Sequence, residues 1–400
     1  MKNNSHIKLL ILFLLRKLLI NYFSGMKRIL FIAAVLISFV TTAQTKLFPV
    51  EIKGKFGYMD QTGKMVISPM YDYADDFSED LAVVALHNLP CVIDQKNVRV
   101  IDTSLYQFIG AFSEGLASVI DFKKKKFYIN TKGEKVISLP DNIYEGRKFK
   151  DGLACVSKEI DEHSQKFNHD IVTLGYRFGF IDKRGKQVID FVYEDASNFS
   201  QGIARVKVKN LFGIINKNGE IILKPSYKNI GNFFEGKAVI NDNGRFGFID
   251  LNGKVIIKPE FDMAFDFSEG LAAIYNNQTK KYGFINEKGE LSIKDEYDGV
   301  RPFSEGKAAI LNNGKWGFID KNGKLVLLNV FDNASVFDEG MCAVLIKRKW
   351  GFIDSTGHVV IPLEYDAVGS FDDGIADVVY HGISLYIDKR GNILPRLNEK

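Results

Sequence analysis

Short hydrophobic stretches recur along the chain, each bounded by Gly, Asn or Asp. In residues 306–340 the hydrophobic stretches are 307–311, 316–320 and 325–328, and the turns between them are Asn312–Gly314 and Asp320–Gly323. Because successive side chains of a β-strand point to opposite faces, Trp316, Phe318 and Asp320 share one face and Gly317 and Ile319 share the other. Asn and Gly tolerate the positive φ that tight hairpin turns require. The unit is therefore predicted to be a three-stranded antiparallel meander, followed by a connector over 331–337.

One glycine per unit sets the period. The successive intervals are 34, 34, 36, 34, 34 and 34 residues, between Gly185, Gly219, Gly253, Gly289, Gly323, Gly357 and Gly391. About 35 residues cannot bury a core alone, so a fixed period of this length predicts a tandem array of stacked units. We expect an all-β array over residues 44–400, with about nine units and a partial C-terminal cap at 384–391.

The number of units predicts the shape. Nine or ten units exceed the four to eight blades that are typical of a propeller, and propeller blades usually carry four strands. Nothing in the first and last units indicates that one completes the other. We therefore expect an open, curved solenoid of three-stranded meanders rather than a closed propeller.

Each unit repeats one signature: an aromatic residue, Gly, Phe or Ile, Ile, Asp or Asn, and a second Gly three residues later. The two copies with Trp contain Trp316, Gly317, Asp320 and Gly323, and Trp350, Gly351, Asp354 and Gly357. We assign all eight residues structural roles. Asp accepts hydrogen bonds within the turn, the first Gly permits close approach of a neighbouring ring, and each Trp is mostly buried between adjacent units.

This signature resembles that of the bacterial WG (Trp-Gly) repeat family. Two further features carry the resemblance, an apolar strand often ending in Pro and a Phe-Ser-Glu-Gly connector. They occur at Pro69, Pro225, Pro259 and Pro362, and at 112–115, 267–270 and 303–306. The resemblance covers about residues 47–395, and it implies a β-repeat fold with an interaction role rather than a reaction.

A leader precedes the array. Met26-Lys27-Arg28, the apolar stretch 29–40 and Thr41-Thr42-Ala43 have the order of a secretory signal peptide, with cleavage predicted after Ala43. We therefore assign 1–43 as leader, favour Met26 as the start, and expect a periplasmic, cell-surface or secreted protein. The apolar run 7–20 is shorter than the roughly 20 residues of a membrane span. No span is expected in the mature chain, and a membrane anchor within 1–25 is the alternative.

The net charge depends on the leader. Residues 1–43 carry six basic side chains and no acidic one, so the 53 Lys and Arg fall to 47 against 49 Asp and Glu. The mature chain is therefore slightly acidic, and no global positive field favours nucleic-acid binding. The run Lys123–Lys126 is interpreted as a solvated hairpin turn, with contact to an anionic polymer as the alternative.

The cysteines are interpreted as structural. Cys91, Cys155 and Cys342 lie in strand stretches where other units carry small residues, so we read them as small buried hydrophobic residues. Units of a solenoid contact only their neighbours, which separates Cys342 from the other two. A Cys91–Cys155 bridge stays open.

No catalytic, cofactor or metal arrangement stands out. The Asp-x-x-Gly turns lack the carboxylate density of a calcium loop. The Glu-Gly of the connector recurs in each unit and is taken as structural. No Gly-rich phosphate loop or nucleophile elbow is present. We expect a non-enzymatic protein with no catalytic residue, no cofactor and no metal.

One unit carries an insertion at 157–174, and this segment is polar and charged. Insertions into a single unit often mark a functional face, and a tolerated loop is the alternative. Its candidate binding residues are Glu159, Asp161, His163, Phe167 and His169.

The predicted function is that of an exported, monomeric scaffold that binds a protein or peptide partner in the cell envelope. The alternative is binding of an envelope polysaccharide through a ladder of aromatic residues, one per unit. These residues are Phe56, Phe178, Phe212, Phe246, Tyr282, Trp316 and Trp350. Exposure of the rings would favour the polysaccharide, and burial would favour a core role.

Overall fold

A computed structural model describes residues 46–101, 103, 106–160 and 175–395 of the 400-residue chain. These residues form 39 β-strands and no helix. The strands build ten antiparallel sheets in chain order, the first with three strands and the other nine with four. The all-β prediction is confirmed, and the prediction of three strands per unit is wrong for nine of the ten sheets.

The first five sheets occupy residues 47–227. Sheet 1 contains β1 (Leu47–Ile52), β2 (Lys55–Asp60) and β3 (Met65–Tyr71). Sheet 2 contains β4 (Tyr73–Ala74), β5 (Leu81–Leu86), β6 (Leu89–Asp94) and β7 (Arg99–Ile101). Sheet 3 contains β8 (Tyr106–Ile109), β9 (Leu116–Asp121), β10 (Lys126–Asn130) and β11 (Lys135–Ser138). Sheet 4 contains β12 (Ile143–Gly146), β13 (Leu153–Ile160), β14 (Gly175–Asp182) and β15 (Gln187–Tyr193). Sheet 5 contains β16 (Asp195–Ala196), β17 (Ile203–Val208), β18 (Leu211–Asn216) and β19 (Ile221–Tyr227).

The other five sheets follow without a break. Sheet 6 contains β20 (Asn229–Ile230), β21 (Lys237–Asp242), β22 (Arg245–Asp250) and β23 (Val255–Phe261). Sheet 7 contains β24 (Met263–Ser268), β25 (Leu271–Asn276), β26 (Lys281–Asn286) and β27 (Leu291–Tyr297). Sheet 8 contains β28 (Gly299–Val300), β29 (Lys307–Asn312), β30 (Lys315–Asp320) and β31 (Leu325–Phe331). Sheet 9 contains β32 (Asn333–Asp338), β33 (Met341–Ile346), β34 (Lys349–Asp354) and β35 (Val359–Tyr365). Sheet 10 contains β36 (Ala367–Val368), β37 (Ile375–Tyr380), β38 (Ile383–Asp388) and β39 (Ile393–Leu394).

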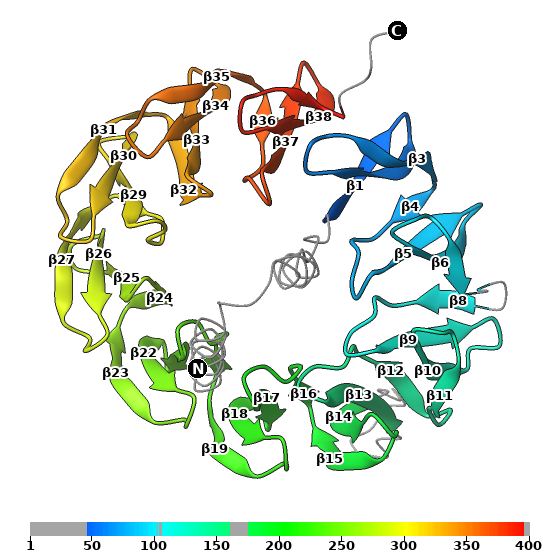
Figure 1. The fold of residues 1–400 in the computed structure, drawn as a ribbon. Helices are drawn as coiled ribbons and strands as arrows, with labels where there is room; N and C mark the ends of the chain where they lie inside the picture. Colours follow the sequence, from blue (N-terminus) through cyan, green and yellow to red (C-terminus); the bar gives the residue numbers. More distant parts are fainter. Residues whose placement is uncertain (1–45, 102, 104–105, 161–174, 396–400) are drawn as a thin grey trace, which may run out of the picture. The chain divides into compact units, whose positions relative to one another are not determined.

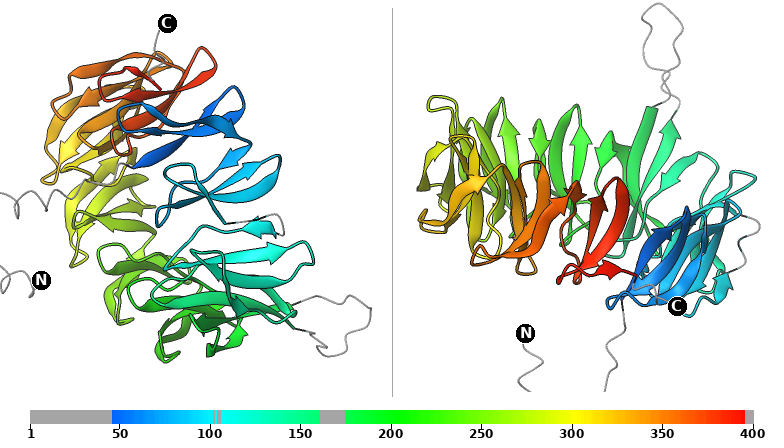
Figure 2. Two further views of the ribbon diagram at one scale, coloured as in Figure 1. Left: turned by 45° about the vertical axis from the view of Figure 1, so that its right-hand side comes forward. Right: turned by 90° about the horizontal axis from the view of Figure 1, so that it is seen from above.

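The ten sheets stand around a common centre as a ten-bladed β-propeller (Figure 1). In sheets 7 and 9 the first strand lies innermost and the last lies outermost (Figure 1), and the other four-stranded sheets have the same order of strands. Sheet 10 lies beside sheet 1 in both views of Figure 2. The predicted open solenoid is therefore wrong.

The fourth strand comes from the connector, which the sequence pattern left without structure. β32, for example, pairs antiparallel with β33 and directly follows β31. In five sheets this inner strand is only two residues long, and such a strand is too short to show a periodic pattern. These strands are β4, β16, β20, β28 and β36.

A pair of aromatic rings holds most junctions between neighbouring sheets. Phe318 on β30 contacts Phe337 on β32 of the next sheet, with ring centroids 5.1 Å apart and planes at 60°. Edge-to-face pairs of this kind add to the gain from burying both rings. The same contact recurs between Tyr58 and Phe77, Tyr128 and Phe149, Phe180 and Phe199, Phe248 and Phe267, Phe284 and Phe303, and Phe352 and Phe371. We call the second ring of each pair, and Phe112 and Phe233 at the same position in sheets 3 and 6, the connector Phe.

The glycine that sets the period touches the preceding sheet. Gly323 has φ +77°, and a Cβ there would lie 3.2 Å from Ile293 on β27. The backbone conformation and the contact both explain why this position is Gly. Gly63 of sheet 1 meets Leu394 of sheet 10 in the same way. Sheet 1 therefore contacts sheet 10 in the way that other sheets contact the sheets before them. This contact closes the ring.

Sheet 1 has no described inner strand or connector Phe, and Phe48 on β1 supplies a ring at the closing junction. At the position of Phe48 the other sheets carry Ala82, Ala117, Ala154, Ala204, Ala238, Ala272, Ala308, Cys342 and Ala376. This small residue lies beside the connector Phe, and Phe337 and Cys342 are direct cross-strand partners. Phe48 and Tyr386 both pack against the apolar cluster that joins sheets 10 and 1.

Hydrogen bonds link the turns of neighbouring sheets. The Ser304 hydroxyl donates to the carbonyl oxygen of Phe337 at 2.6 Å, and the Gly340 N–H donates to the Glu305 carboxylate at 2.9 Å. The same link joins Glu79 to Gly115, Glu114 to Gly152, Glu235 to Gly270, Glu269 to Gly306 and Glu339 to Gly374. The structural role predicted for the recurrent Glu-Gly is confirmed, although it acts between units rather than within one.

The signature residues have mixed outcomes. Trp316 and Trp350 are half-buried against clusters between adjacent sheets, as predicted, and the fully buried rings lie two residues later, at Phe318 and Phe352. Both Trp rings stand at the edge of an inter-sheet cluster, where solvent reaches one side.

The turn residues and the first glycine explain the rest of the signature. The Asp320 carboxylate accepts the N–H groups of Asn322 and Lys324 at 2.9 Å each, and Asp354 repeats this, which confirms the turn assignment. A Cβ at Gly317 would lie 2.7 Å from the Leu327 carbonyl oxygen. The close neighbour is therefore the backbone of the outer strand at a bulge, and the prediction of a neighbouring ring is wrong. Gly351 makes the same approach, and Gly357 contacts Leu327 as Gly323 contacts Ile293.

We predict that Phe318→Ala lowers the free energy of unfolding by roughly 3–5 kcal/mol, because it empties a fully buried ring position. Trp316→Phe is the matched control and should cost less than about 1.5 kcal/mol, since other sheets carry Phe there. Urea unfolding followed by circular dichroism measures both. Equal losses of unfolding free energy in the two variants would contradict the conclusion that the Phe318 ring stabilises the junction more than the Trp316 ring does.

We also predict destabilisation by acid. The pKa of Asp332 is held below its usual range, first by the hydrogen bond from Lys315 and then by the Lys347 N–H. Asp298 and Asp366 repeat this arrangement, and their pKa values are lowered in the same way. A carboxyl group whose pKa is lower in the folded than in the unfolded state stabilises the fold at pH values above its unfolded-state pKa. This stabilisation is lost as the pH falls through the folded-state pKa.

The Tm should therefore change little from neutral pH to about 5 and fall below about pH 4. The triple variant D298N/D332N/D366N should have a lower Tm at pH 7 and a shallower fall in acid. Thermal unfolding across this pH range tests the prediction. Parallel curves of Tm against pH for the parent and the triple variant would contradict a stabilising role of these three carboxylates.

Candidate functional site

Three clefts are lined by residues of the inner strands and of the segments that follow them. Cleft 1, between sheets 3 and 4, has a volume of about 460 Å³. Cleft 2, formed by sheets 4 to 6, has about 500 Å³, and cleft 3, formed by sheets 6 to 8, has about 370 Å³. We call this inner surface the rim.

The rim varies from sheet to sheet while the scaffold beneath it does not. The two residues before each connector Phe are Asp75-Asp76, Gly110-Ala111, Arg147-Lys148, Ser197-Asn198, Gly231-Asn232, Phe265-Asp266, Arg301-Pro302, Ser335-Val336 and Gly369-Ser370. A repeated backbone that presents different side chains at one position is typical of the binding surface of a repeat protein. Most of the lining of clefts 1 to 3 comes from these pairs and their neighbours.

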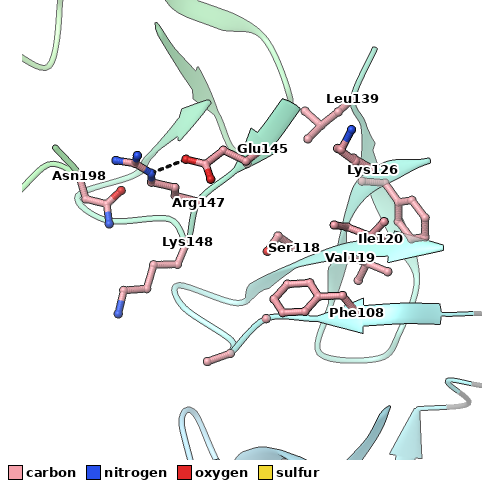
Figure 3. Close-up of a pocket in the computed structure, with 14 residues that line it drawn as sticks. Phe108, Ser118, Val119, Ile120, Lys126, Leu139, Glu145, Arg147, Lys148 and Asn198 are labelled. Carbon is pink, nitrogen blue, oxygen red and sulfur yellow. Dashed lines mark hydrogen bonds and ion pairs between the residues drawn. The ribbon is translucent and has the colours of Figure 1, made fainter. Parts of the chain in front are cut away.

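Cleft 1 has an apolar wall and a charged wall. Figure 3 shows Phe108, Val119 and Ile120 on strands of sheet 3, facing Glu145, Arg147 and Lys148 of sheet 4. The Phe108 side chain is 50% exposed although it lies on an inner strand. An exposed ring beside such a cleft is a candidate contact for a ligand.

The charged wall is fixed by hydrogen bonds. Arg147 Nε donates to the Glu145 carboxylate at 2.8 Å, and Nη1 donates to the Ala196 carbonyl oxygen at 2.8 Å. The guanidinium also lies 5.1 Å from the centre of the Phe178 ring. These contacts hold Arg147 in place, while Lys148 beside it is exposed to solvent. The cleft therefore combines a hydrogen-bonded cation with a solvent-exposed one.

Asn198 joins clefts 1 and 2. Its Oδ1 atom is buried and has no hydrogen-bond partner among the described residues. Buried polar atoms are nearly always paired, so an unpaired acceptor in a cleft wall is suited to a donor from a ligand.

Cleft 3 is more apolar and carries one carboxyl. Phe234 and Phe265 are 45% and 43% exposed and line it together with Pro302. Burial raises the pKa of Asp266, which also lines this cleft. Cleft 1 thus has a cationic wall, whereas cleft 3 has one carboxyl group.

The sequence-predicted binding residues are only partly placed. Glu159 lies half-buried near the end of β13, in sheet 4. Asp161, His163, Phe167 and His169 lie outside the described residues. The rim residues were missed because they belong to connectors that carry no strong pattern. Their signal was the variation of two positions beside an unvarying Phe.

The burial of the predicted aromatic ladder is intermediate between that of a core and that of an exposed surface. Its seven rings, Phe56, Phe178, Phe212, Phe246, Tyr282, Trp316 and Trp350, are all half-buried. Trp316 is the cross-strand partner of Phe331 in its own sheet, as Phe56 is of Tyr71. The rings are neither a free stacking surface nor the main core.

The cysteines and the lysine run agree with their structural interpretation. Cys91, Cys155 and Cys342 are free and buried, so no Cys91–Cys155 bridge is present. Burial raises the pKa of Cys155 and of Cys342 to about 12, which keeps both thiols protonated near neutral pH. Lys123–Lys126 spans the turn between β9 and β10, and Lys125 pairs with Asp141 at 2.6 Å.

One acidic cluster is present on the turns of sheets 9 and 10. Glu339, Asp372 and Asp373 each place a carboxylate oxygen within 4.8 Å of the others. Glu339 already accepts the Gly374 N–H and pairs with Lys389 at 2.9 Å. Its carboxylate therefore serves the link between turns. In the described part of the chain, no helix has the length and apolar character needed to cross a membrane.

The fold and the rim define a ring-shaped β-repeat scaffold. The chain belongs to the WG-repeat family. The family described as "WG containing repeat" matches residues 56–89, 178–212, 212–245, 246–279, 282–316, 316–350 and 350–382. The resemblance drawn from the Trp-Gly signature is thereby confirmed. No curated protein matches the chain.

Solved structures match the chain at low sequence identity. The chain is similar to a crystal structure of the eukaryotic initiation factor, with 9% identity, a TM-score of 0.50 and coverage of 88% of this chain and 95% of the other. It is also similar to BamB from Moraxella catarrhalis, with 9% identity, a TM-score of 0.34 and coverage of 81% and 98%. A streptogramin B lyase matches with 15% identity, a TM-score of 0.29 and coverage of 61% and 92%. At 9% identity the first likeness concerns the fold alone. The other two matches have TM-scores below 0.5, so no conclusion about this chain is drawn from them.

Proposed function

We propose that the chain is an exported, monomeric, non-enzymatic scaffold of the cell envelope whose rim binds an extended peptide segment of a partner protein. Cleft 1 carries this proposal, because it joins an exposed aromatic wall to a fixed cationic wall on inner-strand positions that vary between sheets. Protein-binding surfaces commonly combine an aromatic anchor with Arg in this way.

The chemistry of cleft 1 specifies the peptide. An apolar side chain packs on Phe108 and Ile120, and a carboxylate faces Arg147 and Lys148. The unpaired Oδ1 of Asn198 accepts a backbone N–H of the peptide. A peptide with an apolar residue near an acidic one meets all three features.

The absence of enzymatic activity is supported by the use made of the recurrent acids. The Glu residues of the connectors accept N–H groups from the next sheet, and the Asp residues of the turns accept N–H groups within the turn. Neither set converges on a cleft. Half-burial of the ladder rings, such as Trp316, leaves polysaccharide binding with less support than the rim gives to a peptide.

Selection of linear peptides from a phage-displayed library against the full chain tests the binding site. We expect enrichment of peptides that pair an apolar with an acidic residue. Their affinity should fall about tenfold or more in the double variant F108A/K148E, since aromatic anchors dominate such interfaces. Fluorescence anisotropy with an enriched peptide gives the Kd.

F122A/K123E is the matched control. Phe122 is 56% exposed and Lys123 is its exposed neighbour, on the turn between β9 and β10 rather than on the rim. This variant makes the same chemical change and should keep the parent Kd. No enriched sequence, or equal loss in both variants, would remove cleft 1 as the site.

Export rests on the leader sequence and has its own test. The native gene product should be found in the envelope or the medium with Gln44 as its first residue, as determined by N-terminal mass spectrometry after cell fractionation. A chain that starts at Met1 or Met26 in the cytoplasmic fraction would rule out the exported assignment.

A further inference from the structure

The inner edge of β1 has no partner strand among the described residues. β1 pairs only with β2, whereas the second strand of every other sheet pairs on both sides. An unpaired edge presents a row of backbone groups that can add another strand. This edge lies beside the closing junction between sheets 10 and 1.

The other sheets show which backbone bonds this edge can make. In sheet 2 the N–H groups of Asp72 and Asp75 donate to the carbonyl oxygens of Ala85 and Val83, at 2.8 and 2.9 Å. Sheets 5, 8 and 10 repeat the two bonds. In the register of β1 the equivalent carbonyls belong to Glu51 and Pro49. An added strand must therefore supply two N–H groups three residues apart.

Pro49 is compatible with such an addition. Proline lacks an N–H, and at its position in sheets 5 and 9 the N–H groups of Arg205 and Ala343 bond to a Ser hydroxyl rather than to the inner strand's backbone. Pro49 therefore removes no backbone hydrogen bond that sheets 5 and 9 make to their inner strands at this position. Pro on an edge also limits unselective pairing with other chains.

The junction beside this edge is incompletely covered. Tyr386 takes the position of Phe318 and Phe352, which are 0% and 1% exposed, yet Tyr386 is half-buried. Phe48 is half-buried too, and it stands where the other sheets carry Ala or Cys. A segment that adds here therefore needs a small residue at the connector-Phe position, because the ring of Phe48 already occupies that neighbourhood.

The chain's own sequence before β1 has the matching pattern. Val40 and Ala43 are an apolar and a small residue three positions apart, which is the sequence spacing of Ala334 and Phe337 in sheet 9. The predicted cleavage after Ala43 would remove both, which leaves the edge of the exported chain available to another polypeptide.

We propose that the inner edge of β1 binds an extended segment of a partner polypeptide as a fourth strand of sheet 1. The segment carries small apolar residues three positions apart, in the order apolar-x-x-Ala. Its backbone N–H groups donate to Pro49 and Glu51, and its small side chains pack beside Phe48 and Tyr386. No residue of β1 lines clefts 1 to 3, so the two proposals stand or fall independently.

The probe is a fluorescein-labelled peptide that reproduces residues 331–340 with the change Phe337→Ala, and a second peptide keeps Phe337. The protein is the chain from Gln44, since Leu47 onward forms a compact unit by itself. By fluorescence anisotropy, the Ala peptide should bind saturably and the Phe peptide at least about tenfold more weakly, a difference on the scale of one misplaced core side chain.

The variant Phe48→Ala restores the small residue found in the other nine sheets, so it should reverse the preference of the two peptides. Tyr73→Ala is the control, because Tyr73 is a 50% exposed residue on the neighbouring inner strand, and this variant should keep the parent preference. No binding of either peptide to the parent would overturn the proposal. Binding without reversal in Phe48→Ala would overturn it as well, since an unselective sticky edge gives that result.

Discussion

Every sheet of this protein depends on the ring that its neighbour inserts at the junction. A sheet of about 35 residues has two faces to cover and no helix to cover them. Phe318 covers one face of sheet 8 with the help of Phe337 from sheet 9, while Ile319 covers the other face within the cluster shared with sheet 7. Because both faces need a neighbour, an open array would leave two faces in water. Closure removes both ends.

The closing junction shows how the constraint is met without a tenth connector Phe. Phe48 places a ring on the strand where the other sheets carry Ala or Cys, and Gly63 keeps the common contact with Leu394. The outer part of this junction therefore matches the others, and the inner part does not. The difference leaves the edge of β1 as the irregular position in an otherwise repeated inner ring of strands.

Repetition also separates stability from recognition. The aromatic pairs, the turn glycines and the Glu-to-Gly bonds recur in most sheets, so they serve the ring. The residues just before each connector Phe are not part of these recurring contacts. They differ between sheets, as Asp75, Gly110, Arg147 and Phe265 show. The rim can therefore change its chemistry sheet by sheet without disturbing the junctions. This is the physical basis for assigning partner binding to it.

The sequence predicted the local structure well and the closure poorly. Period, turns and the second to fourth strands followed from Gly323, Asp320 and their copies, because these residues act over a few positions. The inner strands were missed because β4 or β28 offers only two residues. The open shape was predicted from the number of units, whereas closure depends on contacts between residues more than 300 positions apart, such as Gly63 and Leu394. The rim needed the connectors to be placed first, and most candidate residues of the insertion lie outside the described chain.

Closure of the ring is tested most directly by a disulfide across the junction. A Cβ built at Gly63 lies 3.3 Å from the Leu394 Cβ, near the separation that a disulfide requires. The internal pair G323C/I293C, with a corresponding separation of 3.9 Å, should cross-link in an open or a closed array and is the positive control. Under mild oxidation, mass spectrometry of the monomer should show the 63–394 bridge in G63C/L394C as readily as the control bridge. A control bridge without the 63–394 bridge would mean that the array is open.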